Sequence, residues 1–263
     1  MDLGIEGKVA AVGGASTGLG KAIAWALARE GARVAICARG AEQLERTANE
    51  LRESSSGQVL AYPVDLATEN GPQEFIEATV KEFAGIEILV TNAGGPPATT
   101  SSQTPAEAWV AALELSMLSA IRMSQAAIPY MRRNRWGRIV CVTSISVKSP
   151  LPAMVLSNTV RPGVVGYAKT ISQEFAADGI TVNVVCPGYM ATARVTELAE
   201  TRAAQSGKSV DEVMTGLVDN IPAGRMGDPK ELGDLVAFLA SERAAYITGT
   251  ATHIDGGFFR GLM

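Results

Sequence analysis

The sequence offers little of the chemistry that depends on histidine or cysteine. His253 is its only histidine, which leaves no basis for a histidine-rich metal centre or a Ser-His-Asp triad. The cysteines, Cys37, Cys141 and Cys186, all lie in apolar, strand-like runs. Three cysteines without close spacing argue against a disulfide framework and against a zinc site. We therefore expect buried free thiols and no bound metal.

A surplus of positive charge and a long apolar run are also missing. The net charge is −4 and the isoelectric point is about 5.2, so we expect no nucleic-acid partner. No stretch reaches the roughly 18 apolar residues of a transmembrane helix. The opening residues, MDLGIEGK, lack the charged and apolar segments of a signal peptide. The expectation is a cytoplasmic protein without a membrane partner.

Apolar residues make up 47% of the 263 positions, enough for the core of one large domain, and no linker divides the chain. Seven apolar, strand-like runs alternate with six crossover segments. This alternation predicts an α/β fold, a Rossmann-type doubly wound parallel sheet of seven strands in a single domain. The predicted strands cover residues 9–12, 33–39, 59–64, 86–91, 137–144, 181–188 and 250–257.

The first of these strands leads into a glycine-rich turn, KVAAVGGASTGLG, at Lys8–Gly20. Gly14, Gly18 and Gly20 have the spacing G-x3-G-x-G, and a helical run follows. Glycines allow positive φ and close approach of backbone N–H groups to a pyrophosphate, and the dipole of the following helix favours negative charge. A tight strand-to-helix turn alone would also use glycines. The position after the first strand of an alternating chain favours the phosphate site.

These residues, together with Asn92-Ala93-Gly94 and Pro187-Gly188 followed by Thr192, resemble the short-chain dehydrogenase/reductase family over nearly the whole chain. The family's first turn reads T-G-x3-G-x-G, and Gly13 stands where the family has threonine. The resemblance implies that Asn92 ties neighbouring strands together and that Thr192 lies near the nicotinamide carboxamide. The cofactor contacts that the turn and the resemblance predict are Gly14, Ser16, Thr17, Gly18, Leu19, Gly20, Asn92, Ala93, Gly94, Pro187, Gly188 and Thr192.

Cofactor choice depends on the end of the second strand. An acidic residue there binds the ribose hydroxyls of NAD, but Ala38 occupies that place and Arg39 follows it. A cation is suited to a 2′-phosphate, so we expect NADP(H) rather than NAD(H), although Arg39 could also be a solvated surface charge. By resemblance Asp65-Leu66 contacts adenine. A turn or helix-cap aspartate is the alternative.

The catalytic positions depart from the family pattern. The resemblance implies a serine, a tyrosine thirteen residues later, a lysine four residues further, and an asparagine on the fourth helix. The corresponding residues here are Ser144, Ser157, Arg161 and Ser116. A serine hydroxyl is far less acidic than a phenol. Arg161, with an expected pKa above about 12, cannot relay protons, but its guanidinium can bind a ribose, a carboxylate or a carbonyl oxygen.

Other readings of these residues remain open. Ser157 with Asn158 could cap a helix, and Pro162 predicts a helix that begins near Ser157 or kinks there. Lys148 and Tyr189, on loops that border the cleft, are alternative proton donors.

Residues 105–133 read as one long helix that could form a subunit interface, and residues 190–222 as a helical substrate lid. We expect an NADP(H)-dependent oxidoreductase for a small carbonyl or hydroxyl substrate, similar to 3-oxoacyl-carrier-protein reductases. The alternative is an inactive dinucleotide-binding sensor or partner subunit. By resemblance the assembly is a homotetramer or a dimer.

Overall fold

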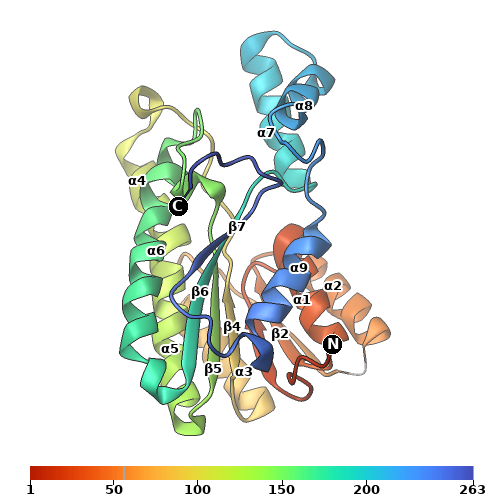
Figure 1. Ribbon diagram of the computed structural model, residues 1–263, viewed down its shortest axis with the longest axis vertical. Coiled ribbons are helices and arrows are strands. Elements are labelled where there is room, and N and C mark those ends of the chain that lie inside the picture. The colour runs from red at the N-terminus through yellow and green to blue at the C-terminus, as the bar shows by residue number, and fades with distance from the viewer. Residues whose placement is uncertain (56, 263) are drawn as a thin grey trace.

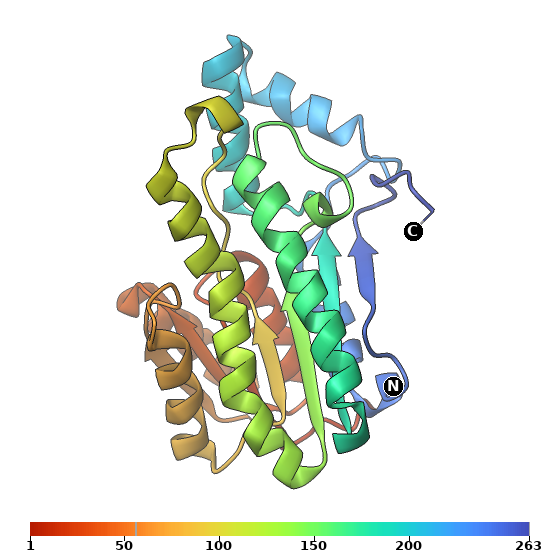
Figure 2. The same cartoon turned by 90° about the vertical axis from the view of Figure 1, so that its left-hand side faces the viewer.

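The computed structural model describes residues 1–55 and 57–262 as one seven-stranded parallel sheet with helices on both faces (Figures 1 and 2). The strand order is β3-β2-β1-β4-β5-β6-β7, and all six neighbouring pairs are parallel. The strands are β1 (Val9–Val12), β2 (Arg33–Ala38), β3 (Val59–Pro63), β4 (Ile88–Thr91), β5 (Gly137–Val142), β6 (Ile180–Pro187) and β7 (Ala251–Ile254). This order confirms the predicted doubly wound sheet.

Helices cover both faces because alternate strand residues point to opposite sides. Ala10 and Val12 pack with α1 (Gly18–Arg29), α2 (Ala41–Ser54) and α9 (Pro229–Leu239). Val9 and Ala11 pack against the other layer. That layer contains α3 (Gly71–Phe83), α5 (Ser119–Asn134) and α6 (Val155–Glu174). Strands buried on both faces explain the unbroken apolar runs in the sequence.

The predicted long helix is present with a change of winding in the middle. It consists of α4 (Ala106–Leu113), a π-helical turn at Glu114–Leu118 and α5, in one continuous path. A π turn inserts an extra residue into the helical ladder and often marks a functional site. Ser116 lies in this turn.

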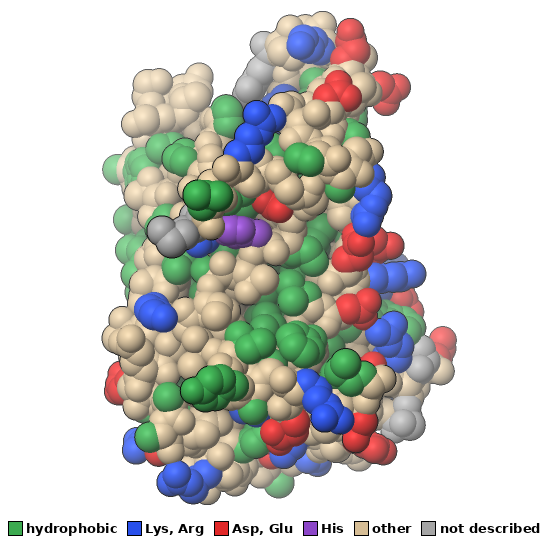
Figure 3. Space-filling model, viewed as in Figure 1, with side chains coloured by type: hydrophobic (Ala, Val, Ile, Leu, Met, Phe, Trp, Pro, Cys, Tyr) green, Lys and Arg blue, Asp and Glu red, His purple; other side chains and the backbone are tan. Residues whose placement is uncertain are grey.

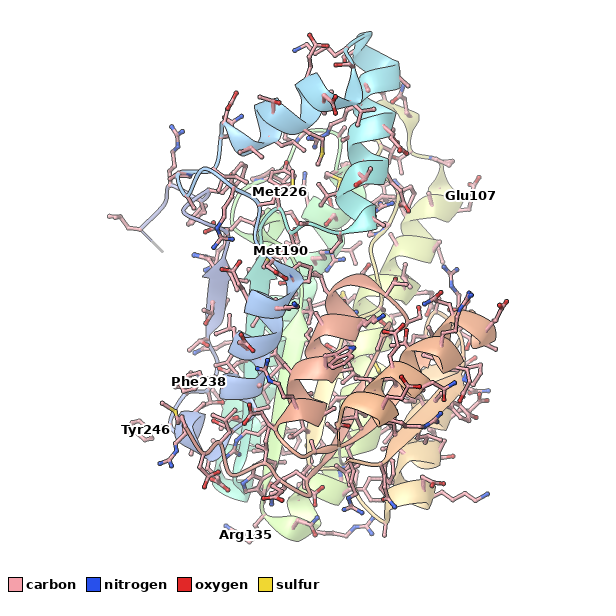
Figure 4. The ribbon with its side chains drawn as sticks, turned by 90° about the vertical axis from the view of Figure 1, so that its right-hand side faces the viewer. Glu107, Arg135, Met190, Met226, Phe238 and Tyr246 are labelled. Atoms are coloured by element: carbon pink, nitrogen blue, oxygen red, sulfur yellow. The ribbon has the colours of Figure 1, made fainter. Side chains whose placement is uncertain are left out.

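The predicted lid contains α7 (Ala193–Ser206) and α8 (Val210–Val218), which project beyond the carboxyl ends of the strands (Figure 1). Its two ends are tied together, because the Ala191 N–H donates to the Gly227 carbonyl at 2.9 Å and the Gly227 N–H donates to Tyr189 at 3.0 Å. Met190 and Met226 mark this base in Figure 4. The lid helices therefore rise from a fixed pair of strand-like segments.

The three cysteines are free and buried, as predicted, in β2, β5 and β6. Burial raises the pKa of Cys37 to about 12 and that of Cys141 to about 11, and it also raises the pKa of Cys186. Among the described residues no three His, Cys, Asp or Glu side chains form a group that could hold a metal. Within the same residues no helix is long and apolar enough to cross a bilayer.

Candidate functional site

The glycine turn after β1 meets the end of β4 where the strand order reverses, the usual ligand site of such sheets. Gly14 has φ of +57°, and a Cβ there would lie 2.7 Å from the Asn92 carbonyl oxygen. A Cβ on Gly20 would overlap the carbonyl oxygen of Gly14. The Asn92 amide donates to the carbonyls of Gly13 and Gly14 at 3.1 and 3.2 Å. Asn92 thus ties β4 to the turn.

The same close approach gives a physical reason for the departure from the family threonine at position 13. The Gly13 N–H donates to the Val90 carbonyl at 3.1 Å, which draws the turn against β4. A Cβ on Gly13 would lie 2.6 Å from the Asn92 carbonyl oxygen and 3.1 Å from Leu66. A threonine at this position would need the backbone to shift.

The N-terminus of α1 has the features of an anion site, and they test whether a dinucleotide fits here. Thr17 makes no side-chain cap, and the first turn of α1 contains no acidic residue. Gly18 has φ of +56°, and the nearest atom to a Cβ there would be Cγ2 of Thr192, at 3.8 Å. Free N–H groups and the helix dipole at such a terminus favour a phosphate. The residues present therefore fit a dinucleotide diphosphate at the N-terminus of α1, beside Thr192.

The remaining predicted cofactor residues surround this turn. The Ser16 carbonyl accepts from the Thr47 hydroxyl at 2.8 Å, which fixes the turn against α2. Leu19 packs against the core, and Leu66 is buried. Ala93 and Gly94 follow β4, Pro187 ends β6, and Gly188 follows it. All of them lie at the carboxyl edge of the sheet.

Arg39 and Asp65 lie just past the ends of β2 and β3, as predicted. Arg39 is exposed and takes part in none of the ion pairs found among the described residues. The Asp65 carboxylate accepts from the Ala67 N–H at 2.9 Å, the turn contact named as the alternative role. Its second oxygen remains for a further donor.

Ser144 and Ser157 are joined through Ser146. The Ser144 hydroxyl accepts from the Ser146 N–H at 3.1 Å, and the Ser146 and Ser157 hydroxyl oxygens are 3.1 Å apart. Ser157 is only 2% exposed, whereas Ser144 is half-buried. Ser144 keeps its own O–H free to donate, because a hydroxyl has one donor and two acceptor positions.

The helix-cap reading of Ser157 and Asn158 is wrong. Helix α6 begins at Val155 after Met154, so both residues lie inside its first turns. The Asn158 amide donates to the Leu151 carbonyl at 2.9 Å and accepts from the Leu151 N–H at 3.1 Å. Asn158 therefore fixes the loop before α6 and does not cap the helix.

Arg161 joins the ends of two strands. Its Nη1 donates to the Thr143 carbonyl at 2.7 Å, and its Nη2 donates to the Gly94 carbonyl at 2.7 Å. Burial, followed by the positive charge of Arg194, lowers the pKa of Arg161 to about 10, which corrects the expected value above about 12. The guanidinium still carries its charge at neutral pH. Nη1 also donates to the Val142 carbonyl at 3.5 Å. Because a guanidinium has five N–H groups, two remain for a ligand.

Ser116 reaches the interior from the π-helical turn. Its hydroxyl oxygen is buried and has no hydrogen-bond partner among the described residues. A buried hydroxyl without a partner costs free energy unless a water or ligand completes it. This unsatisfied hydroxyl agrees with a site that holds another molecule.

The lid, the loop at 151–153 and the C-terminal segment line an open cavity of about 620 Å³. Tyr189 lines it and packs edge-on against Phe258, with ring centroids 5.4 Å apart. Leu151 and Leu217 form apolar parts of the cavity wall, and Arg202 adds a positive charge to it. Lys148 is half-buried, near enough to Cys186 for its charge to act on the pKa of the thiol. Of the two alternative donors, Tyr189 is the one that lines the cavity.

One residue of the cleft was missed from the sequence. Arg194, in the first turn of α7, donates from Nη2 to the Pro96 carbonyl at 2.9 Å. This bond joins the lid to the loop that follows β4. The available signal was a cation two residues after Thr192, in a segment read only as a polar lid.

The fold and the glycine turn define the class of the protein, a Rossmann-type α/β protein of the dinucleotide-binding kind. Residues 14–259 match the family model described as enoyl-(acyl carrier protein) reductase. The chain belongs to the short-chain dehydrogenase/reductase family, and its resemblance is to oxidoreductases of the 3-oxoacyl-[acyl-carrier-protein] reductase type.

The relatives are similar over their whole length. The 3-oxoacyl-[acyl-carrier-protein] reductase of Vibrio cholerae is 35% identical over 257 residues, which cover 98% of this chain and 99% of that one. The reductase of the same name from Escherichia coli is 34% identical with the same coverage. Among solved structures, L-sorbose reductase from Gluconobacter frateurii, complexed with NADPH and L-sorbose, has a TM-score of 0.95, 34% identity and 100% coverage of both chains. An actinorhodin polyketide ketoreductase with NADPH has a TM-score of 0.93 and 31% identity, covering 97% of this chain and 98% of that one.

Proposed function

We propose that this chain is an NADP(H)-dependent oxidoreductase that acts on a small carbonyl or hydroxyl substrate, with Ser157 and Arg161 in place of the family's tyrosine and lysine. The observation that carries the proposal is the position of Arg161. Its guanidinium donates to the carbonyls of Gly94 and Thr143, just past the ends of β4 and β5, and keeps N–H groups for a ligand. A cation fixed there can polarise a carbonyl oxygen or hold a ribose.

The preference for NADP(H) rests on the end of β2. Arg39 is exposed beside the turn, and Ala38 offers no carboxylate to repel a 2′-phosphate. The side-chain amide of Gln43, on α2, donates to the Ser16 carbonyl at 3.5 Å, so it lies beside the glycine turn. The sorbose reductase and the polyketide ketoreductase, both described with NADPH, support the same choice. When bound, the cofactor supplies a hydride to the carbonyl carbon.

In this proposal Ser144 and Arg161 contact the carbonyl oxygen. The Ser144 O–H is free to donate, and Arg161 adds positive charge where negative charge develops. Ser157, buried against Ser146, positions the Ser144 segment. The proton comes from water or from another side chain, for which Tyr189 is the candidate in the cavity wall. Ser116 would hold a water near the reacting centre.

The substrate would enter the 620 Å³ cavity under the lid.

A homo-oligomer, dimer or tetramer, is part of the proposal. Val110 and Leu113 on α4 are 61% and 38% exposed, and Tyr246 is fully exposed. Hydrophobic side chains gather near the end of α9 and the segment that leads to β7 (Figure 3), where Phe238 and Tyr246 lie (Figure 4). Light scattering during size-exclusion chromatography tests the assembly.

A dinucleotide-binding protein without catalysis is the second candidate. The hydroxyl of Ser157 is buried against Ser146, so the family's proton-donor position presents no acid to the cleft. Such a protein would bind the cofactor and respond to it without turnover.

Calorimetric titration with NADPH and NADH, followed by a panel of 3-oxoacyl thioesters, ketoses and simple ketones, separates the two. The proposal expects NADPH binding and turnover that Arg161→Ala removes. Binding without turnover on any of these substrates would favour the inactive candidate, and binding of neither dinucleotide would refute both.

A further inference from the structure

Two arginines from different elements hold the same short loop. Arg161 on α6 donates to Gly94, and Arg194 on α7 donates to Pro96. Between them, Nη2 of Arg161 lies 3.3 Å from the place where a Cβ on Gly95 would be. The loop at 94–96 thus accepts one hydrogen bond from Arg161 on α6 and one from Arg194 on the lid.

These two positive charges are close enough to interact. The charge of Arg194 contributes to the lowered pKa of Arg161. Arg161 has no carboxylate partner among the described residues, and Arg194 has Glu197 at 3.4 Å, a pair that is largely exposed. The two like charges repel each other, and an anion bound close to both would relieve this repulsion.

The position of Arg194 indicates which anion. It lies two residues after Thr192, whose methyl group faces Gly18 at the N-terminus of α1. That terminus offers free N–H groups to a phosphate. The Arg194 side chain spans from the first turn of α7 to the loop after β4, so it joins the segment that follows Thr192 to that loop.

We propose that Arg194 is a lid-borne ligand of the cofactor diphosphate, which lies between the N-terminus of α1 and Arg194, with the positive charge of Arg161 adding to the attraction. This inference rests on the proposed dinucleotide site. A phosphate oxygen is a stronger acceptor for a guanidinium than the neutral Pro96 carbonyl, because the hydrogen bond is charge-assisted. Cofactor binding therefore draws the first turn of α7 onto the cleft and closes the base of the lid. A carboxylate of the substrate is the other anion that could occupy the pair.

Calorimetry on the whole protein with three nucleotides tests the assignment. NADPH and ADP-ribose contain the diphosphate, and 2′-AMP does not. For Arg194→Gln we expect the dissociation constants of NADPH and ADP-ribose to rise at least tenfold, while that of 2′-AMP stays within twofold. Arg29→Gln, which removes a more exposed arginine from the far end of α1, controls for net charge. Glu197→Gln, which removes only the ion-pair partner, should leave all three constants within twofold.

Each other result decides against the proposal. An unchanged NADPH constant together with a raised KM for carboxylate-bearing substrates would assign the pair to the substrate. A uniform loss that includes 2′-AMP would mean a purely structural role. If wild type binds NADPH, the proposed cofactor site stands whatever Arg194→Gln shows; if wild type binds none of the nucleotides, the proposed function itself fails.

Discussion

The glycine turn and the proposed catalytic segment lie at the same carboxyl edge of the sheet, yet they relate to the family in opposite ways. At the turn, Gly14 and Gly20 are held where a side chain would collide with backbone, and Asn92 fixes the turn through two hydrogen bonds. In the proposed catalytic segment, Ser157 and Arg161 stand where we propose that the family pair has been replaced, and each has hydrogen-bond partners of its own. The first region permits little change without loss of the fold, whereas the second has changed and remained packed.

The proposed function separates cofactor binding from proton delivery in this fold. Backbone geometry makes the phosphate site, so its residues are constrained by close approach. Proton delivery depends on side chains at the surface of the cleft. The same backbone can therefore present different groups there.

The largest effect should come from a side chain in the turn. Gly14→Ala forces a positive φ on alanine and places a Cβ 2.7 Å from the Asn92 carbonyl oxygen. We expect a loss of about 2–3 kcal/mol in the free energy of unfolding and a loss of NADPH affinity of about 100-fold or more. Urea unfolding and calorimetry measure the two. Gly166→Ala, inside α6 with open space around it, should instead add about 0.5–1 kcal/mol. Equal changes in the free energy of unfolding and in NADPH affinity for Gly14→Ala and Gly166→Ala would contradict the special constraint on the glycine turn.

On the catalytic side, Arg161→Ala should reduce kcat/KM about 100-fold, because it removes the cation at the cleft mouth. Arg161→Lys keeps the charge but not the fork that spans Gly94 and Thr143, so we expect about a tenfold loss. Steady-state kinetics with the best substrate of the panel measures both. An alanine variant as active as wild type would remove Arg161 from the reaction.

A third prediction concerns pH and the thiol beneath the turn. Burial raises the pKa of Cys37 from 9.0 to about 12. Below pH 9 both folded and unfolded chains keep the proton, so this thiol does not alter stability. From pH 9 to about 12 the unfolded chain releases the proton more readily, so stability falls as pH rises, by about 2 kcal/mol at pH 10.5. Cys37→Ala should show a shallower decline from pH 8.5 to pH 10.5 in urea unfolding. Parallel curves for both proteins would contradict the assignment.

The smallest effect should come from Ser116. Its buried hydroxyl has no partner among the described residues, so Ser116→Ala should leave the free energy of unfolding unchanged or raise it by up to about 1 kcal/mol. Chemical denaturation measures this directly. Destabilisation by more than 1 kcal/mol would mean that the hydroxyl is already satisfied in the folded protein.

Much of the fold followed from the sequence because its signals are local. The apolar runs and their alternation with helical segments predicted all seven strands in their order along the chain. The edges were less certain, and the third and fifth strands end one or two residues earlier than predicted. Asp65 and Arg39 were placed correctly because they directly follow strands.

The site was less predictable because its contacts join distant residues. The bond from Arg161 to Gly94 spans 67 positions, and the bond from Arg194 to Pro96 spans 98. No local pattern encodes such pairs. The lowered pKa of Arg161 and the seclusion of Ser157 depend on how strands, lid and helix α6 meet, which only the folded chain shows.

The central claim, that the dinucleotide site has been kept while the catalytic pair has been replaced, is tested most directly by calorimetric titration of the wild-type protein with NADPH and NADH. We predict one site per chain with NADPH bound at least tenfold more tightly than NADH. Absence of binding heat with either dinucleotide at any concentration up to the millimolar range would contradict it.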